Sequence, residues 1–133
     1  MKEFVQKVNE ATLGSTYLFS VGQAGFIIKS KEGNLFAIDL YLSDCVERDE
    51  GHVGFKRLMP KILAPDELNL DIIVATHPHL DHFDYDSMAG IMANGKTKLF
   101  ASVNCQNYVQ SLKINEDMLP MLSQMKPIKR KIL

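Results

Sequence analysis

Four side chains that can bind divalent metals lie within one short segment near the middle of the chain: His77, His79, Asp81 and His82. His77 and His79 are two residues apart in an extended segment, so their imidazoles point to the same side and can share one metal ion. Asp81 and His82 lie where the chain turns toward a helix, so they can face a second ion. Two such ions about 3.5–4 Å apart lower the pKa of a shared water toward neutrality. The spacing therefore predicts half of a two-metal hydrolytic site, because four ligands are fewer than two ions normally take.

The alternative interpretation of this segment is a polar loop that carries histidines by chance. Three of the chain's four histidines lie in it. They directly follow residues 70–76, a short, β-branched, apolar run that indicates a buried strand. Ligand-type residues clustered at the end of a strand are typical of a metal site, and we favour that interpretation. Asp84 is placed to hold a ligand imidazole from outside the coordination sphere.

The elements around the motif predict a layered α+β fold with a mixed β-sheet and flanking helices. Apolar residues at helical spacing indicate a helix at the N-terminus, and short apolar runs separated by turn residues indicate strands. A helix capped by Asp84 or Asp86 follows the motif. The expected strands are 17–20, 25–30, 34–39, 70–76 and 98–102, and the expected helices are 2–11, from 84 or 86 to about 95, and 104–112.

Residues 43–70 form a long polar stretch with glycines and prolines, for which we predict irregular structure and one helical turn over 58–63. Connections of this length inside a domain are usually functional or mobile. Lys56 and Arg57 lie in this stretch and could contact an anionic substrate. A solvated loop is the commoner role for such charges, because most surface charges have no partner.

Composition limits the class of protein. The chain has 133 residues, 46% of them hydrophobic, which suits a single domain over residues 1–133. A net charge of -1 and a pI near 6.4 give no basic excess for nucleic-acid binding. The two cysteines fit a reducing cytoplasm, and the charged N-terminus does not resemble a signal peptide. No apolar run approaches the roughly 20 residues of a membrane span. We therefore expect a cytoplasmic protein with a small-molecule substrate and neither nucleic-acid nor membrane partners.

The sequence HPHLDH, preceded by DIIVAT and followed by Asp84, resembles the HxHxDH signature of the metallo-β-lactamase superfamily. The segments VGQAGFIIKS, LFAIDLYLSD and KTKLFASVNCQNYVQSL resemble its lactonase-like branch. The resemblance implies an αββα sandwich made of two similar halves, of which this chain would supply only the first. It implies that His77 and His79 bind the first metal and that Asp81 and His82 bind the second.

The resemblance also implies the chemistry. Two divalent ions, Zn or Mn, would hold a bridging hydroxide that attacks a carbonyl of a small anionic substrate, and Asp81 would hold the attacking water or assist proton transfer. The family's remaining ligands are a further histidine, a bridging carboxylate and a last histidine. They are expected after Leu133 and have no counterpart here, and His52 matches none of them. The sequence leaves the substrate-binding residues unknown.

Three functions stay open at this point. The first is a metal-dependent hydrolase of lactones or related esters. The second is a truncated, non-catalytic homologue that binds metal weakly or not at all. The third, a nucleic-acid-processing hydrolase, is disfavoured by the charge. A half-sandwich would expose an apolar sheet face, so we also expect a homo-oligomer that buries it.

Overall fold

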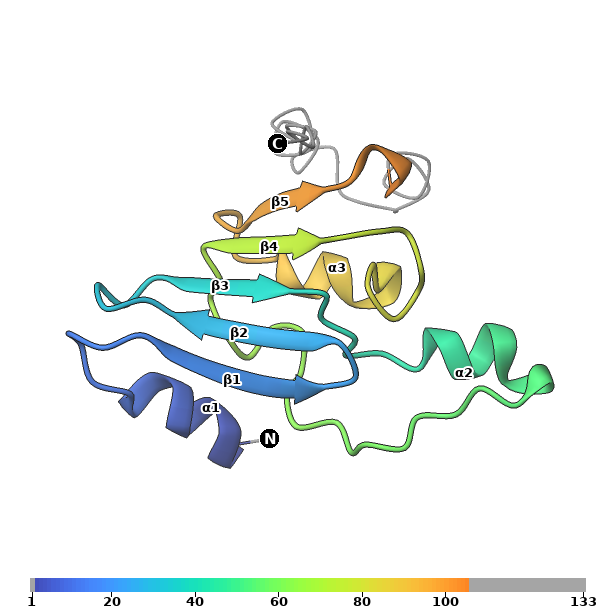
Figure 1. The fold of residues 1–133 in the computed structure, drawn as a ribbon, viewed down its shortest axis with the longest axis horizontal. Coiled ribbons are helices and arrows are strands. Elements are labelled where there is room, and N and C mark those ends of the chain that lie inside the picture. Colours follow the sequence, from blue (N-terminus) through green and yellow to red (C-terminus); the bar gives the residue numbers. More distant parts are fainter. Residues whose placement is uncertain (1, 106–133) are drawn as a thin grey trace, which may run out of the picture.

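The computed structural model describes residues 2–105 of the chain (Figure 1). This part has an α+β fold in which a five-stranded mixed sheet, ordered β1-β2-β3-β4-β5, is accompanied by three helices. No helix in the described range is long and apolar enough to cross a membrane. The strands are β1 Tyr17–Gly22, β2 Gly25–Lys29, β3 Leu35–Ile38, β4 Ile72–Ala75 and β5 Lys98–Ala101. The helices are α1 Lys2–Glu10, α2 Cys45–Glu50 and α3 Tyr85–Ile91, with 3₁₀ turns η1 Gly51–Val53 and η2 Val103–Cys105.

The sheet changes from antiparallel to parallel at β3. The first three strands form two hairpins, whereas β3, β4 and β5 run parallel, with Ile38 paired to Val74 and Val74 paired to Phe100. Parallel neighbours need a crossover connection, and α3 provides it between β4 and β5. The carboxyl ends of β3, β4 and β5 therefore meet at one edge of the sheet. The histidine motif follows β4 at that edge.

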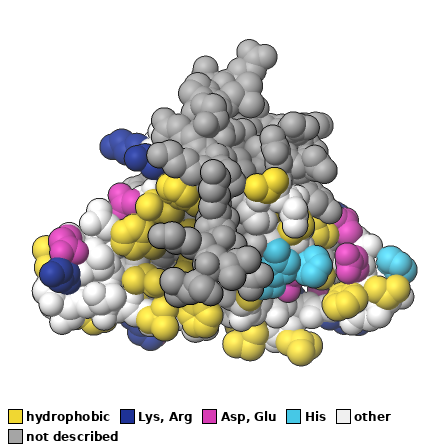
Figure 2. All heavy atoms as spheres, turned by 45° about the horizontal axis from the view of Figure 1, so that its top comes forward, with side chains coloured by type: hydrophobic (Ala, Val, Ile, Leu, Met, Phe, Trp, Pro, Cys, Tyr) yellow, Lys and Arg dark blue, Asp and Glu magenta, His cyan; other side chains and the backbone are white. Residues whose placement is uncertain are grey.

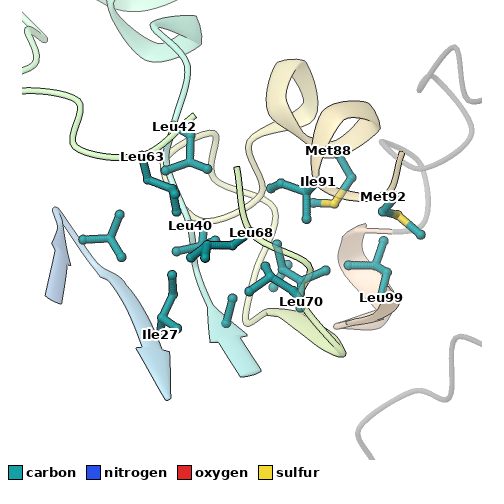
Figure 3. Packing of buried hydrophobic residues seen from close by; sticks show 14 of the residues in the cluster. Ile27, Leu40, Leu42, Leu63, Leu68, Leu70, Met88, Ile91, Met92 and Leu99 are labelled. Carbon is teal, nitrogen blue, oxygen red and sulfur yellow. The ribbon is translucent and has the colours of Figure 1, made fainter. Parts of the chain in front are cut away.

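The hydrophobic core lies on one face of the sheet. Alternate strand residues, such as Ile27 in β2 and Ile73 in β4, point into it and are fully buried. α3 and the irregular chain that precedes β4 cover this face (Figure 3). Figure 3 labels the principal residues of this layer: Ile27, Leu40, Leu42, Leu63, Leu68, Leu70, Met88, Ile91, Met92 and Leu99.

A buried ammonium group fixes the N-terminal helix to the same face. Lys29 on β2 is buried and donates hydrogen bonds to the carbonyl oxygens of Val8, Asn9 and Ala11, at 2.8, 3.0 and 2.8 Å. These carbonyls belong to the last turn of α1 and the residue after it, where oxygens lack partners within the helix. A cation at this end also complements the helix dipole. Lys29 therefore joins α1 to the sheet.

The opposite face of the sheet is mostly apolar. Strand register aligns its side chains in two rows that cross the sheet, and the only charged residue in them is the exposed Lys98 at the β5 end of one row. Leu18, at the β1 edge, is 66% exposed, and most other members are half-buried. One row is Leu18, Ile28, Phe36, Ile72 and Lys98, and the other is Ser20, Phe26, Ile38, Val74 and Phe100.

Most of the predicted elements are confirmed within one to four residues, and two predictions for the 43–70 stretch are wrong. The structure has no helical turn over 58–63 and instead forms α2 and η1 at the start of the stretch. The α2 sequence CVERDE buries only Cys45, so it carries no apolar stripe that could have indicated a helix. The helix predicted over 104–112 lies almost entirely outside the described residues.

We expect two copies of the chain to bury the second sheet face against each other, because contiguous apolar patches are rare on monomers. Leu18→Lys places a charge at the exposed end of one row and should shift the oligomer toward monomer in light scattering. Leu13→Lys is the matched control, because Leu13 is 69% exposed but lies outside both rows. A wild-type chain that is monomeric at high concentration would contradict this expectation.

Candidate metal centre

The histidine loop spans residues 76–84, between β4 and α3. Its backbone turns sharply, since the amides of His82 and Phe83 both donate to the carbonyl oxygen of His79, at 2.9 and 2.7 Å. Phe83 is fully buried and anchors the loop in the core. The turn brings the imidazoles together: the ring centroid of His77 lies 4.6 Å from that of His79, edge to face, and 3.9 Å from that of His82, with the rings tilted by 43°. The loop thus gathers the three predicted histidines on one side.

A carboxylate from a distant part of the sequence completes this arrangement. Asp39 follows β3, is buried, and accepts hydrogen bonds from the amide and hydroxyl of Thr76, at 2.8 and 2.7 Å. Its Oδ2 also lies 2.9 Å from Nδ1 of His82. The parallel pairing of Ile38 with Val74 brings these residues together across the sheet edge. Sequence reasoning missed Asp39, although an aspartate at a strand end was visible.

The backbone of Asp39 has an uncommon conformation. Its φ of +50° lies in the left-handed region, which few residues other than glycine adopt and which aspartate tolerates better than most. The conformation turns the chain out of β3 while the Asp39 amide still donates to the carbonyl oxygen of Val74, at 2.9 Å. The same turn leaves the carboxylate facing the histidine loop. Strained backbone of this kind is often retained at functional sites.

The hydrogen bonds assign the protons on two imidazoles. Thr76 has one hydroxyl hydrogen and donates it to Asp39, so its oxygen must accept from Nδ1 of His77, 3.0 Å away. The Asp39 carboxylate can only accept, so Nδ1 of His82 is also protonated. In neutral rings this leaves Nε2 of His82 with a free lone pair, whereas the lone pair on Nε2 of His77 accepts a hydrogen bond from Nδ1 of His79, 3.0 Å away. A free lone pair is what a metal ligand needs.

The four predicted ligands form two pairs of donor atoms. Nε2 of His77 lies 3.0 Å from Nδ1 of His79, and Nε2 of His82 lies 3.8 Å from Oδ2 of Asp81. Two ligands of one tetrahedral zinc ion, each about 2.0–2.1 Å from it, are about 3.3 Å apart. One spacing is shorter than that value, because the two histidine nitrogens share a hydrogen bond, and the other is longer. The donor types suit zinc or manganese. Over residues 2–105, however, no three such side chains converge on one point.

Asp84 has a different role from the predicted one. Its buried carboxylate caps α3 by accepting from the amide of Ser87, at 3.2 Å, and it also accepts from the amides of Leu42 and Ser43, at 2.8 and 2.7 Å. The hydroxyls of Ser43 and Ser87 donate to it as well, at 2.6 and 2.7 Å. The predicted contact with a ligand imidazole is made by Asp39 instead. Asp84 therefore ties the start of α3 to the chain leaving β3, and the predicted helix cap is confirmed.

A buried thiol lies behind the loop. The Cys45 thiol contacts the carbonyl oxygen of Leu80 at 3.7 Å and Oδ1 of Asp84 at 3.5 Å. Burial raises the pKa of Cys45 to about 12, and the nearby negative charge of Asp84 adds to this effect. Metals bind the thiolate, so Cys45 stays a protonated core residue at neutral pH rather than a ligand.

Arg57 is not the solvated loop residue that the sequence predicted. Its side chain is only 9% exposed, and it donates hydrogen bonds to the carbonyl oxygens of Tyr41 and Ser43. The guanidinium also lies 3.9 Å from the centroid of the Tyr41 ring, a cation–π distance. Arg57 therefore holds the long connection against the segment that follows β3. Both of these hydrogen bonds come from Nη2, while Nε lies 3.4 Å from Oδ1 of Asp44 as an ion pair and has no hydrogen-bond partner.

Comparisons with known proteins identify no relative of this chain. No model of a known protein family matches the chain, and a search of curated proteins finds no match. The interpretation of the site therefore depends on its residues and geometry.

The contacts of Asp84 predict a structural role. Asp84→Asn should lower the free energy of unfolding by about 2–3 kcal/mol, because a buried acceptor of charge-assisted bonds is replaced by a group that can accept fewer of them. Urea denaturation measures this loss. Asp86→Asn is the control, because Asp86 forms a surface ion pair with Arg48 and should cost much less. Equal losses in the two variants would contradict the assigned role.

Proposed function

We propose that this chain corresponds to the first αβ half of a metallo-β-lactamase-like αββα sandwich, and that its histidine loop binds divalent metal for hydrolysis of a lactone or related ester. The two donor pairs at the carboxyl edge of the parallel strands carry this proposal. Their placement agrees with the rule that sites in such sheets lie beyond the carboxyl ends of the strands. The sheet with its helix-covered face is what one half of such a sandwich would contribute.

Each residue of the loop has a proposed task. His77 and His79 would hold one ion, and Asp81 and His82 would hold a second. Zinc or manganese bound there would lower the pKa of a bound water and polarise the substrate carbonyl. Asp39 and Thr76 hold the Nδ1 protons of the ligand rings and fix their orientation. Asp81 is partly exposed, so its carboxylate is available to hold water or accept a proton.

The second candidate is a homologue that folds but does not catalyse. The specific observation in its favour is that each described donor pair supplies two ligands, whereas structural zinc sites normally have four and catalytic sites three. Such a chain would bind metal weakly. The hydrolase and the non-catalytic homologue differ in whether they turn over substrate. Metal affinity and hydrolysis must therefore be measured separately.

The metal proposal predicts that His77→Ala lowers zinc affinity at least tenfold in isothermal titration calorimetry, because it removes one of the two donors of the first pair. His52→Ala is the matched control. His52 is exposed on η1 and should not alter binding. Zinc-dependent hydrolysis of a simple lactone that His77→Ala abolishes would support the enzyme over the non-catalytic homologue. If His77→Ala and His52→Ala both retained zinc binding, the assignment of the metal site to the histidine loop would be contradicted.

Asp39 should tune the site without contacting metal. Asp39→Asn keeps the shape and tolerates the left-handed backbone, but it weakens the hold on the Nδ1 protons. We expect zinc affinity to fall about 10–100-fold, the usual effect of losing a partner behind a ligand. Thr76→Val removes only the hydroxyl that links Asp39 to His77 and should give a smaller loss. Unchanged affinity in both variants would contradict this role.

A further inference from the structure

Residues 44–56 leave the body of the fold and return to the point where they left it. The chain forms α2 and η1 and comes back at Arg57, which donates a hydrogen bond of 3.0 Å to the carbonyl oxygen of Tyr41 and another to that of Ser43. Figure 1 shows α2 projecting beyond the carboxyl edge of the sheet. Surface excursions of this length with adjoining ends are often functional. Arg57 closes the base of this excursion.

The excursion has little buried surface beyond its base. Cys45 is the only buried residue of α2, and η1 buries none. Even the apolar side chains of Val53 and Phe55 are 63% and 54% exposed. A segment with few buried apolar contacts has little free energy holding it in one position. Residues 46–55 can therefore move together while Cys45 and Arg57 keep the base in place.

A group of surface side chains joins α2 to α3. Arg48 donates hydrogen bonds to the hydroxyl of Tyr85 and the carboxylate of Asp86, and the Tyr85 hydroxyl donates to Asp49. The guanidinium also lies 5.6 Å from the centroid of the Tyr85 ring, within the range of a cation–π contact. The Arg48 side chain is 52% exposed, so water and salt compete for these contacts. We call these four residues the Arg48 cluster.

The excursion forms one wall of a cavity beside the histidine loop. The cavity has a volume of about 420 Å³, within the range of small-molecule sites. Val46, Glu50 and Phe55 line it from the excursion, and residues 78–81 line it from the loop. Figure 2 shows histidine side chains next to hydrophobic and acidic ones on one face of the molecule. Movement of the excursion would therefore widen the cavity and expose more of the loop.

We propose that residues 46–55 form a hinged cover beside the histidine loop, and that the Arg48 cluster holds this cover in the closed position seen in this structure. The hinge lies at the base, between Cys45 and Arg57. Covers of this kind commonly control the entry of ligands to a site. The movement involves none of the candidate metal ligands and does not depend on metal. Its role in ligand access rests on the proposed function.

Spin labels on two exposed residues measure the position of the cover. Val53→Cys on η1 and Ala89→Cys on α3 carry the labels, while the native cysteines, Cys45 and Cys105, are buried. Pulsed electron paramagnetic resonance then gives the distance between the labels. We expect Arg48→Gln to populate a second, longer distance at least about threefold more than the wild type, because exposed ion pairs shift equilibria by about this factor. NaCl at about 1 M should do the same in the wild type by screening the cluster.

Two further variants assign the effect to the Arg48 cluster. Asp86→Asn removes the carboxylate on α3 and should populate the same longer distance as Arg48→Gln. Lys7→Gln is the matched control, because Lys7 forms an exposed ion pair with Glu3 on α1, outside the cluster. Distances that stay unchanged in Arg48→Gln and Asp86→Asn, or that Lys7→Gln changes equally, would overturn the inference.

Zinc binding to the unlabelled proteins separates the cover from the proposed function. Faster association of zinc with Arg48→Gln than with the wild type, measured by stopped flow, would support the role of the cover in access. Equal association rates would overturn that role and leave the metal site standing. Movement of the labels without any zinc binding would support the cover and count against the metal site.

Discussion

The carboxylate of Asp39 is buried between two parallel strands, and its partners come from the segment after β4. A buried charge is costly unless hydrogen bonds compensate it, so this position requires Thr76 and His82 to stay in place. The same contacts fix the start and the turn of the histidine loop. The orientation of the His82 ring and the protonation of Nδ1 in His77 and His82 follow from this interaction.

A second buried carboxylate, Asp84, lies close in sequence to the histidines, but its role is structural. Its partners are backbone amides and serine hydroxyls, which tie α3 to the chain leaving β3. The two aspartates are chemically identical, and their neighbours assign one to the imidazoles and the other to the helix cap. Arg57 adds a third connection by holding the long segment before β4 against Tyr41. Together these contacts connect the elements that flank the histidine loop.

Local patterns predicted the parts of this structure that depend on local forces. Alternation and turn residues located the five strands, and the cap of α3 followed from an aspartate before an apolar face. The contact of Asp39 with His82 spans 43 positions and depends on β3 lying parallel to β4, which no local pattern indicates. The burial of Arg57 depends in the same way on the path of a long connection. α2 was missed because a six-residue polar helix has no periodicity to detect.

Long-range ¹H–¹⁵N NMR of the imidazole rings, recorded while zinc is added, tests the central claim most directly, because the chain has four histidines. Without metal, His77 and His82 should both show Nδ1 protonated in their neutral forms. Zinc should then shift Nε2 of these two rings and Nδ1 of His79, and leave His52 unchanged. Rings of His77 and His82 protonated on Nε2 in the metal-free chain, or a zinc response no larger than that of His52, would contradict the account.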